Sequence, residues 1–134
     1  MTASVYPVLR YADAPSAIEW LCKAFGFEEV LVIPAESGLI SHAELRLGDG
    51  IIMLGSVHPD GEAMRIKSPQ EVGAATQGIY VTVGEVDDHY ERAKAMGAQV
   101  VRELQDTEYE SREYTVRDLE GNFWSFGTYR PAGA

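Results

Sequence analysis

The chain has 134 residues, 46% hydrophobic and 24% charged, a composition typical of one globular domain with a single core. Its 21 acidic and 11 basic side chains give a net charge of −10, which repels phosphate backbones and anionic lipids, so we expect no nucleic-acid partner and no membrane partner. No apolar run approaches the ~20 residues that span a bilayer and no signal peptide is evident, which predicts a cytoplasmic protein. Cys22 is the only cysteine; an intrachain disulfide is therefore excluded, and we expect a small buried hydrophobe.

The first half of the chain has the pattern of a βαβββ unit. A strand is predicted over 5–11, followed by a helix that Asp13 caps and Gly26 ends. Apolar residues at helical spacing give this helix one buried face. Three further strands are predicted over 29–33, 41–47 and 50–55.

The second half repeats this order after a polar connection over 56–77, whose length suits a functional segment, a dimer contact or disorder. A helix is predicted from a cap near Asp87 to Met96, and strands over 79–83, 99–103, 112–117 and 122–129. The first strand, the end of the helix and the last strand of the first half recur in the second half at a nearly constant distance along the chain, which indicates two copies of one unit. We therefore predict a single domain over 1–134, with modules at about 5–55 and 78–129.

Strand alternation predicts which side chains face a cleft between the modules. Ala43, Leu45 and Leu47 should pack under a helix, because they alternate with polar neighbours. The opposite, cleft-facing side of the predicted strands then carries His42, Glu44, Arg46, Tyr80, Thr82, Phe123, Ser125 and Gly127.

The order of these pieces, with the turn Asp118-Leu119-Glu120-Gly121-Asn122 and the strand Ser41-His42-Ala43-Glu44-Leu45-Arg46-Leu47, resembles the glyoxalase, bleomycin-resistance and extradiol-dioxygenase superfamily, also called vicinal oxygen chelate proteins. The resemblance runs from Val5 to Tyr129. It implies an α+β (mixed α/β) fold in which two βαβββ modules form an open U-shaped β-barrel, usually in a homodimer. It leaves function open, because the superfamily includes enzymes and non-catalytic drug binders.

Enzymes of this superfamily hold a metal ion with His, Glu or Gln from the first and last strand of each module. The matching positions here are Tyr6, Met53, Gly78 (Gln77 with a one-residue slip) and Ser125. None of Tyr6, Met53, Gly78 and Ser125 is an ordinary ligand for such a metal. We therefore expect no metal and no cofactor, and the resemblance is strongest to bleomycin-resistance-like members without the metal site.

Two polar side chains keep an enzymatic alternative open. His42 and Glu44 are the candidate catalytic residues, with His42 as a base or with both joining Glu113 in an unconventional metal site. The plainer interpretation makes His42 a hydrogen-bonding wall residue and Glu44 an ion-pair partner of Arg46 or Arg117. We expect solvent exposure for His58, His89 and the acidic stretch 103–113. That stretch would also suit the entrance of a cleft that attracts cations.

The leading hypothesis is a small-molecule-binding protein that sequesters an aromatic or cationic antibiotic or metabolite without a metal. The alternative is a lyase, isomerase or dioxygenase-type enzyme that uses His42. A third possibility is a dimeric interaction module whose cleft is filled by its own side chains. The predicted ligand-binding residues are Tyr6, Val8, His42, Met53, Tyr80, Thr82, Glu113, Phe123 and Ser125.

Overall fold

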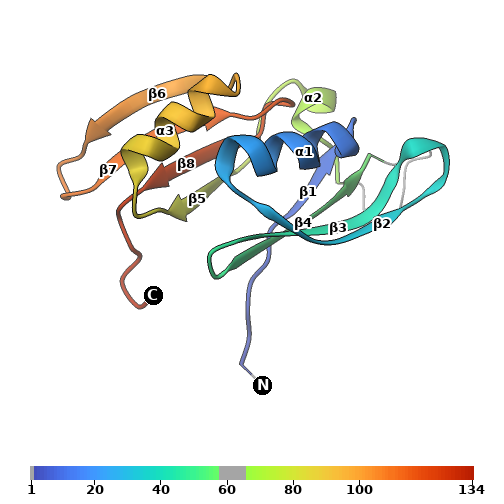
Figure 1. Cartoon of the computed structure of the whole chain (residues 1–134), viewed down its shortest axis with the longest axis horizontal. Helices are drawn as coiled ribbons and strands as arrows, with labels where there is room; N and C mark the ends of the chain where they lie inside the picture. The colour runs from blue at the N-terminus through green and yellow to red at the C-terminus, as the bar shows by residue number, and fades with distance from the viewer. Residues whose placement is uncertain (1, 58–65) are drawn as a thin grey trace.

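The structure is a computed structural model that describes residues 2–57 and 66–134; His58 lies outside them. Two four-stranded sheets lie side by side, with the two longest helices together on one side of them (Figure 1). The first sheet and its helices comprise β1 (Val8–Tyr11), α1 (Ala14–Phe25), β2 (Glu28–Pro34), η1 (Glu36–Gly38), β3 (Ile40–Leu47) and β4 (Gly50–Ser56). The rest comprises α2 (Pro69–Val72), β5 (Gly78–Thr82), α3 (Val86–Ala95), β6 (Gln99–Asp106), β7 (Arg112–Arg117) and β8 (Phe123–Gly127).

The two sheets have the same internal order, β1-β4-β3-β2 and β5-β8-β7-β6. In each sheet the first and last strands pair in parallel, and the other neighbours are antiparallel. The predicted α+β fold with two βαβββ units is therefore confirmed. In the described residues no strand pairing joins one sheet to the other.

The ends of α1 follow the predicted signals. Asp13 accepts a hydrogen bond from the Ser16 N–H at 3.2 Å, and Gly26 ends the helix in the left-handed conformation with φ of 89°. For α3 the predicted cap near Asp87 is wrong, because the helix begins after Glu85, which makes no capping bond through its side chain. Asp87 instead forms an ion pair with Arg112 from β7.

Two predicted strands are shorter than expected. The first strand begins at Val8 rather than at residue 5, and Val5 is 92% exposed. Pro7 immediately precedes the strand and has no N–H to donate. The last strand runs from Phe123 to Gly127, because the chain turns back over β5 after Gly127.

Both modules share one hydrophobic core. Ala43 and Leu45 are buried under the helices, whereas His42 and Glu44 lie on the opposite face of β3, as the alternation predicts. Trp124 and Phe126 are fully buried in the second sheet. The ring of Phe25 from α1 lies 5.3 Å and 4.7 Å from them, so the first helix packs on the second sheet.

The turn before β8 also joins the modules. The buried carboxylate of Asp118 accepts hydrogen bonds from the Tyr11 hydroxyl at 2.7 Å and the Trp124 indole at 2.9 Å. Its other oxygen accepts from the backbone N–H groups of Glu120 and Asn122. The motif that carried the family resemblance therefore links the start of module one to the core of module two.

The expectation that His89 is solvated is wrong. It is partly buried on α3, where one ring nitrogen bonds the Tyr114 hydroxyl and the other bonds the carbonyl oxygen of Phe25.

Cys22 is partly buried against the core, and burial raises its pKa. Across the described ranges, no helix combines the length and the apolar character that crossing a membrane requires.

Candidate small-molecule site

A cavity of about 670 Å³ lies over the face of the second sheet that points away from the helices. Three tyrosines, one carboxylate and one guanidinium carry its chemistry: Tyr80, Tyr109, Tyr129, Glu113 and Arg102. All its lining residues come from the second module and the segment after β8. We call it the tyrosine cavity. Its volume falls in the range of ligand pockets, about 300–1,000 Å³.

Strand register brings the floor of the tyrosine cavity together. Ser125 of β8 lies between Tyr80 of β5 and Thr115 of β7, so these three side chains share one face. The hydroxyls of Thr115 and Ser125 are 2.7 Å apart and hydrogen-bonded. Glu113 stands opposite Gly127 in the same register.

Gly127 makes room for two of the cavity side chains. A Cβ atom at this position would lie 2.8 Å from the Tyr80 hydroxyl and would overlap Cγ of Glu113. Both side chains therefore cross the backbone of β8 where no side chain is present. The shape of the cavity therefore requires a glycine at this position of β8.

The segment after β8 forms one wall. Its Tyr129 carbonyl oxygen accepts hydrogen bonds from the Tyr80 hydroxyl at 2.7 Å and the Thr82 hydroxyl at 2.8 Å. The Tyr129 ring meets Tyr80 at 6.1 Å and 67°, and Tyr109 at 5.8 Å and 85°. The Tyr129 ring is thus steeply inclined to both of the other rings at the cavity.

Some of the charged groups in and near the site already form hydrogen bonds or ion pairs within the protein. The Tyr109 hydroxyl donates to Glu113 Oε1 at 2.7 Å, and this bond raises the pKa of Tyr109. Burial, and then the charge of Glu113, raise the pKa of Tyr80. Both phenols therefore stay neutral at physiological pH. In the neighbouring acidic stretch, Asp106 is paired with Arg112.

The predicted ligand-binding residues do not gather in one cavity. Tyr80, Glu113 and Ser125 line the tyrosine cavity. Thr82 lines an adjacent groove of about 580 Å³ between β4 and β5, and Phe123 lines a hollow of about 390 Å³ beside α2. The remaining ones, Tyr6, Val8, His42 and Met53, come from the first module and lie outside the tyrosine cavity.

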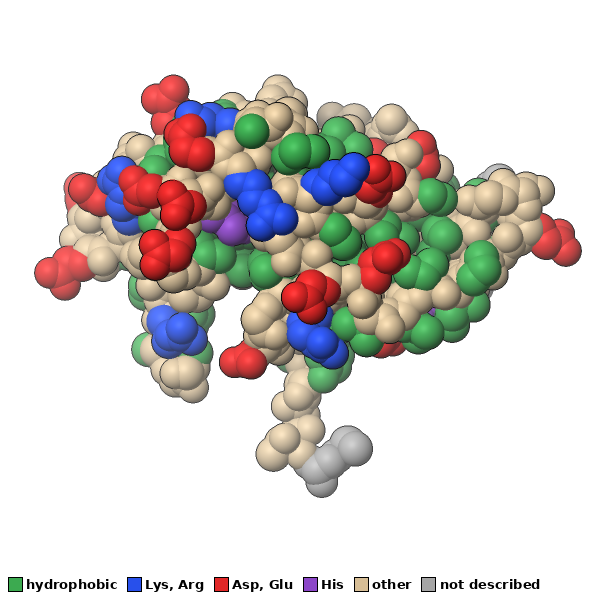
Figure 2. All heavy atoms as spheres, in the orientation of Figure 1, with side chains coloured by type: hydrophobic (Ala, Val, Ile, Leu, Met, Phe, Trp, Pro, Cys, Tyr) green, Lys and Arg blue, Asp and Glu red, His purple; other side chains and the backbone are tan. Residues whose placement is uncertain are grey.

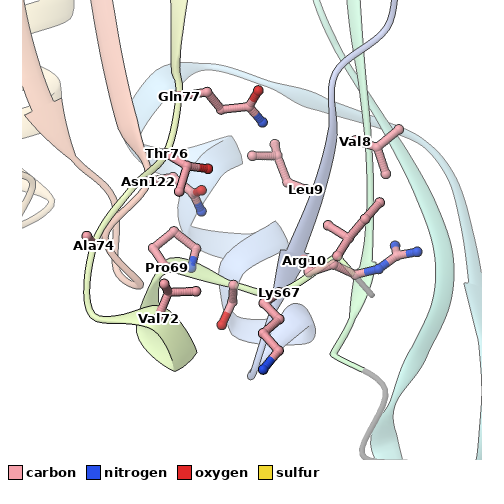
Figure 3. Close-up of a pocket in the computed structure, with 12 residues that line it drawn as sticks. Val8, Leu9, Arg10, Lys67, Pro69, Val72, Ala74, Thr76, Gln77 and Asn122 are labelled. Carbon is pink, nitrogen blue, oxygen red and sulfur yellow. The ribbon is translucent and has the colours of Figure 1, made fainter. Parts of the chain in front are cut away.

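Val8 contributes to a smaller pocket of about 260 Å³ between β1 and the segment that follows α2 (Figure 3). Figure 3 shows Leu9 and Asn122 facing the space, whereas Val8 and Arg10 point to the other side of β1. The Asn122 side-chain nitrogen is buried and has no hydrogen-bond partner among the described residues. The site of Val8 is therefore separate from that of Tyr80.

His42 and Glu44 form a pair on the outward face of the first sheet. His42 Nε2 lies 2.8 Å from Glu44 Oε2, and both side chains are half-buried. Their strand neighbours in register are Ile33, Leu31 and Met53. In residues 2–57 and 66–134, Glu44 pairs with neither Arg46 nor Arg117.

Tyr6, Met53, Gly78 and Ser125, at the family's metal positions, do not fit a metal, and Gln77, the alternative to Gly78, lines the separate pocket beside β1. Met53 offers a thioether, Gly78 offers no side chain, and Ser125 is hydrogen-bonded to Thr115. Tyr6 is 48% exposed and precedes β1. The described part of the chain also contains no group of three His, Cys, Asp or Glu side chains suited to a metal ion.

Sequence reasoning missed Tyr109, Tyr129 and Arg102. Tyr109 lies in the turn before β7 and Tyr129 lies beyond β8, so strand alternation says nothing about either. One local signal was present in the sequence. Tyr109 is an aromatic residue within an acidic stretch, and it lies shortly before Glu113 across the same turn. Arg102 lies next to a register shift in β6. The period-two alternation therefore does not predict which face of the sheet its side chain is on.

The sequence and the fold match a known class of protein. The model of the glyoxalase, bleomycin resistance protein and dioxygenase superfamily matches residues 4–126, so this chain belongs to that superfamily. The resemblance inferred from the sequence is confirmed.

The chain is also similar to individual proteins. An uncharacterised protein of Mycobacterium bovis, Mb0911c, is 35% identical over 121 residues, which are 90% of this chain and 80% of that protein. Among solved structures, TioX from Micromonospora sp. ML1 is 36% identical with a TM-score of 0.75, covering 97% of this chain and 98% of TioX. The fosfomycin resistance protein FosX from Listeria monocytogenes shares the fold at 16% identity, with a TM-score of 0.72, covering 98% of this chain and 96% of FosX.

Proposed function

We propose that this chain is a cytoplasmic small-molecule-binding protein that sequesters an aromatic or cationic antibiotic or metabolite without a metal. The observation that carries the proposal is the tyrosine cavity, with its three aromatic walls and few polar groups. Such a lining is typical of small-molecule sites. Membership of a superfamily that includes bleomycin resistance proteins agrees with binding as a function.

Affinity would come from ring stacking and apolar burial. An aromatic pair contributes about 1 kcal/mol beyond the area it buries, so three tyrosines would support a planar ligand. The net charge of −10 would speed the approach of a cation. No bond changes in this function, so the ligand should be recovered unaltered.

A thermal-shift screen against aromatic and cationic antibiotics tests the proposal. We expect at least one compound to raise the unfolding temperature of the wild-type chain, and the shift to shrink in Tyr129→Ala. Glu108→Ala, an exposed acidic change outside the cavity, serves as the control. A broad panel without any shift would contradict the proposal.

The proposed working form is a homodimer of single-domain chains. The face of the first sheet with Leu31 and Ile33 is exposed apolar surface on the edge strand β2. On the face drawn in Figure 2, hydrophobic side chains also gather at the β2–β3 end, while acidic ones gather around α3. Sedimentation would detect the dimer, and Leu31→Lys with Ile33→Lys should yield monomers.

The second candidate function is a lyase, isomerase or dioxygenase-type reaction on an oxygenated metabolite. The hydrogen bond between His42 and Glu44 favours it, because a carboxylate that orients an imidazole makes it a better base. This function predicts turnover that His42→Gln abolishes. The binding proposal predicts instead that His42→Gln leaves recovery of unaltered ligand from the tyrosine cavity unchanged.

A further inference from the structure

We propose that the tyrosine cavity recognises an organic cation through an alkylammonium group. This inference rests on the proposed binding function and names the chemistry of its ligand. Four side chains would hold the group: Tyr80, Tyr109, Tyr129 and Glu113.

The first argument is the arrangement of the rings. Tyr129 stands at 67° to Tyr80 and at 85° to Tyr109, with ring centroids about 6 Å apart in both pairs. A ring that is steeply inclined to its neighbours leaves them room to turn a negative face toward the space they line, which attracts a diffuse positive charge more than a flat stack does. Cages of aromatic rings are the usual recognition device for alkylated ammonium groups.

The second argument is the carboxylate within the same space. Glu113 Oε1 accepts the Tyr109 hydroxyl, and among the described residues Oε2 has no hydrogen-bond partner. Gly127 lets the Glu113 side chain lie across β8 toward Tyr80. The carboxylate is therefore positioned by the Tyr109 bond and by the space above Gly127, and it keeps one oxygen that can face a cation.

Arg102 provides the competing possibility. Its guanidinium also lines the cavity and would favour an anionic ligand. Locally the charges of Arg102 and Glu113 cancel, so the net charge of −10 and the three ring faces decide in favour of a cation. At about 670 Å³ the cavity exceeds one trimethylammonium group, which indicates that the cation is carried on a larger molecule.

Three probes of similar shape and different charge test the proposal in NMR titrations of the full chain. They are choline, its neutral isostere 3,3-dimethylbutan-1-ol and the anion 3,3-dimethylbutanoate. We expect choline to shift the tyrosine ring resonances and to bind about fivefold or more tighter than the alcohol. Equal binding of choline and the alcohol would overturn the proposal, and so would the absence of choline binding.

Variants then assign the effect to particular groups. Glu113→Gln should weaken choline about tenfold and leave the alcohol unchanged. Tyr109→Leu and Tyr129→Leu should each weaken choline about 2- to 5-fold, and they replace side chains that are 57% and 42% exposed, so the fold should persist. Tyr109→Phe keeps the ring and should bind more tightly than Tyr109→Leu. Glu108→Gln is the matched charge control.

The same series separates this inference from the proposed function. Tighter binding of 3,3-dimethylbutanoate, lost in Arg102→Gln, would make the ligand an anion and overturn the inference while the binding function stands. If compounds of the antibiotic panel bind in the cavity and choline does not, the inference alone fails. If neither the panel nor any of the three probes binds, both fail.

Discussion

Glu120 and His89, both from the second module, hold opposite ends of the same helix of the first module. The Glu120 carboxylate accepts the N–H groups of Ala12 and Asp13 at 2.6 Å and 2.8 Å, just before α1 begins. His89 Nε2 donates to the carbonyl oxygen of Phe25, the last residue of α1, at 2.8 Å. Since no strand pairing joins the described parts of the two sheets, this helix is a principal link between the modules.

Removing the carboxylate at the start of α1 should destabilise the protein. Glu120→Ala leaves two backbone N–H groups without their acceptor, at a cost of about 1–3 kcal/mol in the free energy of unfolding. Urea denaturation would measure the loss. The exposed change Glu108→Ala should alter the free energy by about 0.5 kcal/mol at most. Equal effects of the two variants would refute a capping role for Glu120.

The buried carboxylate of Asp118 should contribute more than any one of its donors. Asp118→Asn replaces one acceptor oxygen by a donor, beside the Tyr11 hydroxyl and the Trp124 indole, and should cost about 3 kcal/mol. Tyr11→Phe removes a single donor and leaves the other three bonds intact, so about 1 kcal/mol is expected. Thermal unfolding followed by tryptophan fluorescence would rank the two variants, and the reverse order would contradict this account.

The stability of the protein should fall at mildly acidic pH because of His89. Burial lowers its pKa and the charge of Arg92 lowers it further, while the bond to Phe25 raises it in part. The unfolded chain therefore binds the proton more readily than the folded chain. Stability is retained above the ordinary histidine pKa of about 6.5, falls as the pH drops below it, and levels off below the folded pKa.

A comparison of wild type with His89→Gln isolates this contribution. Urea unfolding at about pH 7.5 and about pH 5.5 should show a smaller pH-dependent loss in the variant, whatever its absolute stability. The other groups facing His89 are the Tyr114 hydroxyl, whose pKa is raised by burial, and the Arg92 guanidinium. An unchanged pH dependence in the variant would show that other groups cause it.

A methyl group at Gly127 should impair the tyrosine cavity without unfolding the chain. Gly127→Ala would push Glu113 and the Tyr80 hydroxyl away from β8, so binding of choline and of any aromatic ligand should weaken about tenfold. Gly84→Ala is the matched control, because a Cβ atom there has no neighbour within 4 Å in the described structure. Titration of both variants with one ligand checks the prediction. Equal affinities would mean that the positions of Glu113 and Tyr80 do not matter.

Features set by neighbouring residues were predictable from the sequence. Asp13 and Gly26 bound α1 as expected, because capping depends on residues within one helical turn. The alternation along β3 placed Ala43 and His42 on the correct faces, because side chains alternate in any strand. The prediction for α3 failed at Asp87, since an arginine from β7 competes for that carboxylate.

The sequence alone therefore determined the duplicated α+β fold, its superfamily and the faces of its strands, all of which follow from local periodicity and short motifs. Only the tertiary structure decided that His89 joins the modules, because its partners Phe25 and Tyr114 lie 64 and 25 positions away. It also decided that Tyr109 and Tyr129 meet Tyr80 at one cavity. No local pattern encodes that meeting, because it depends on where a turn and the segment after β8 pack once both sheets have formed.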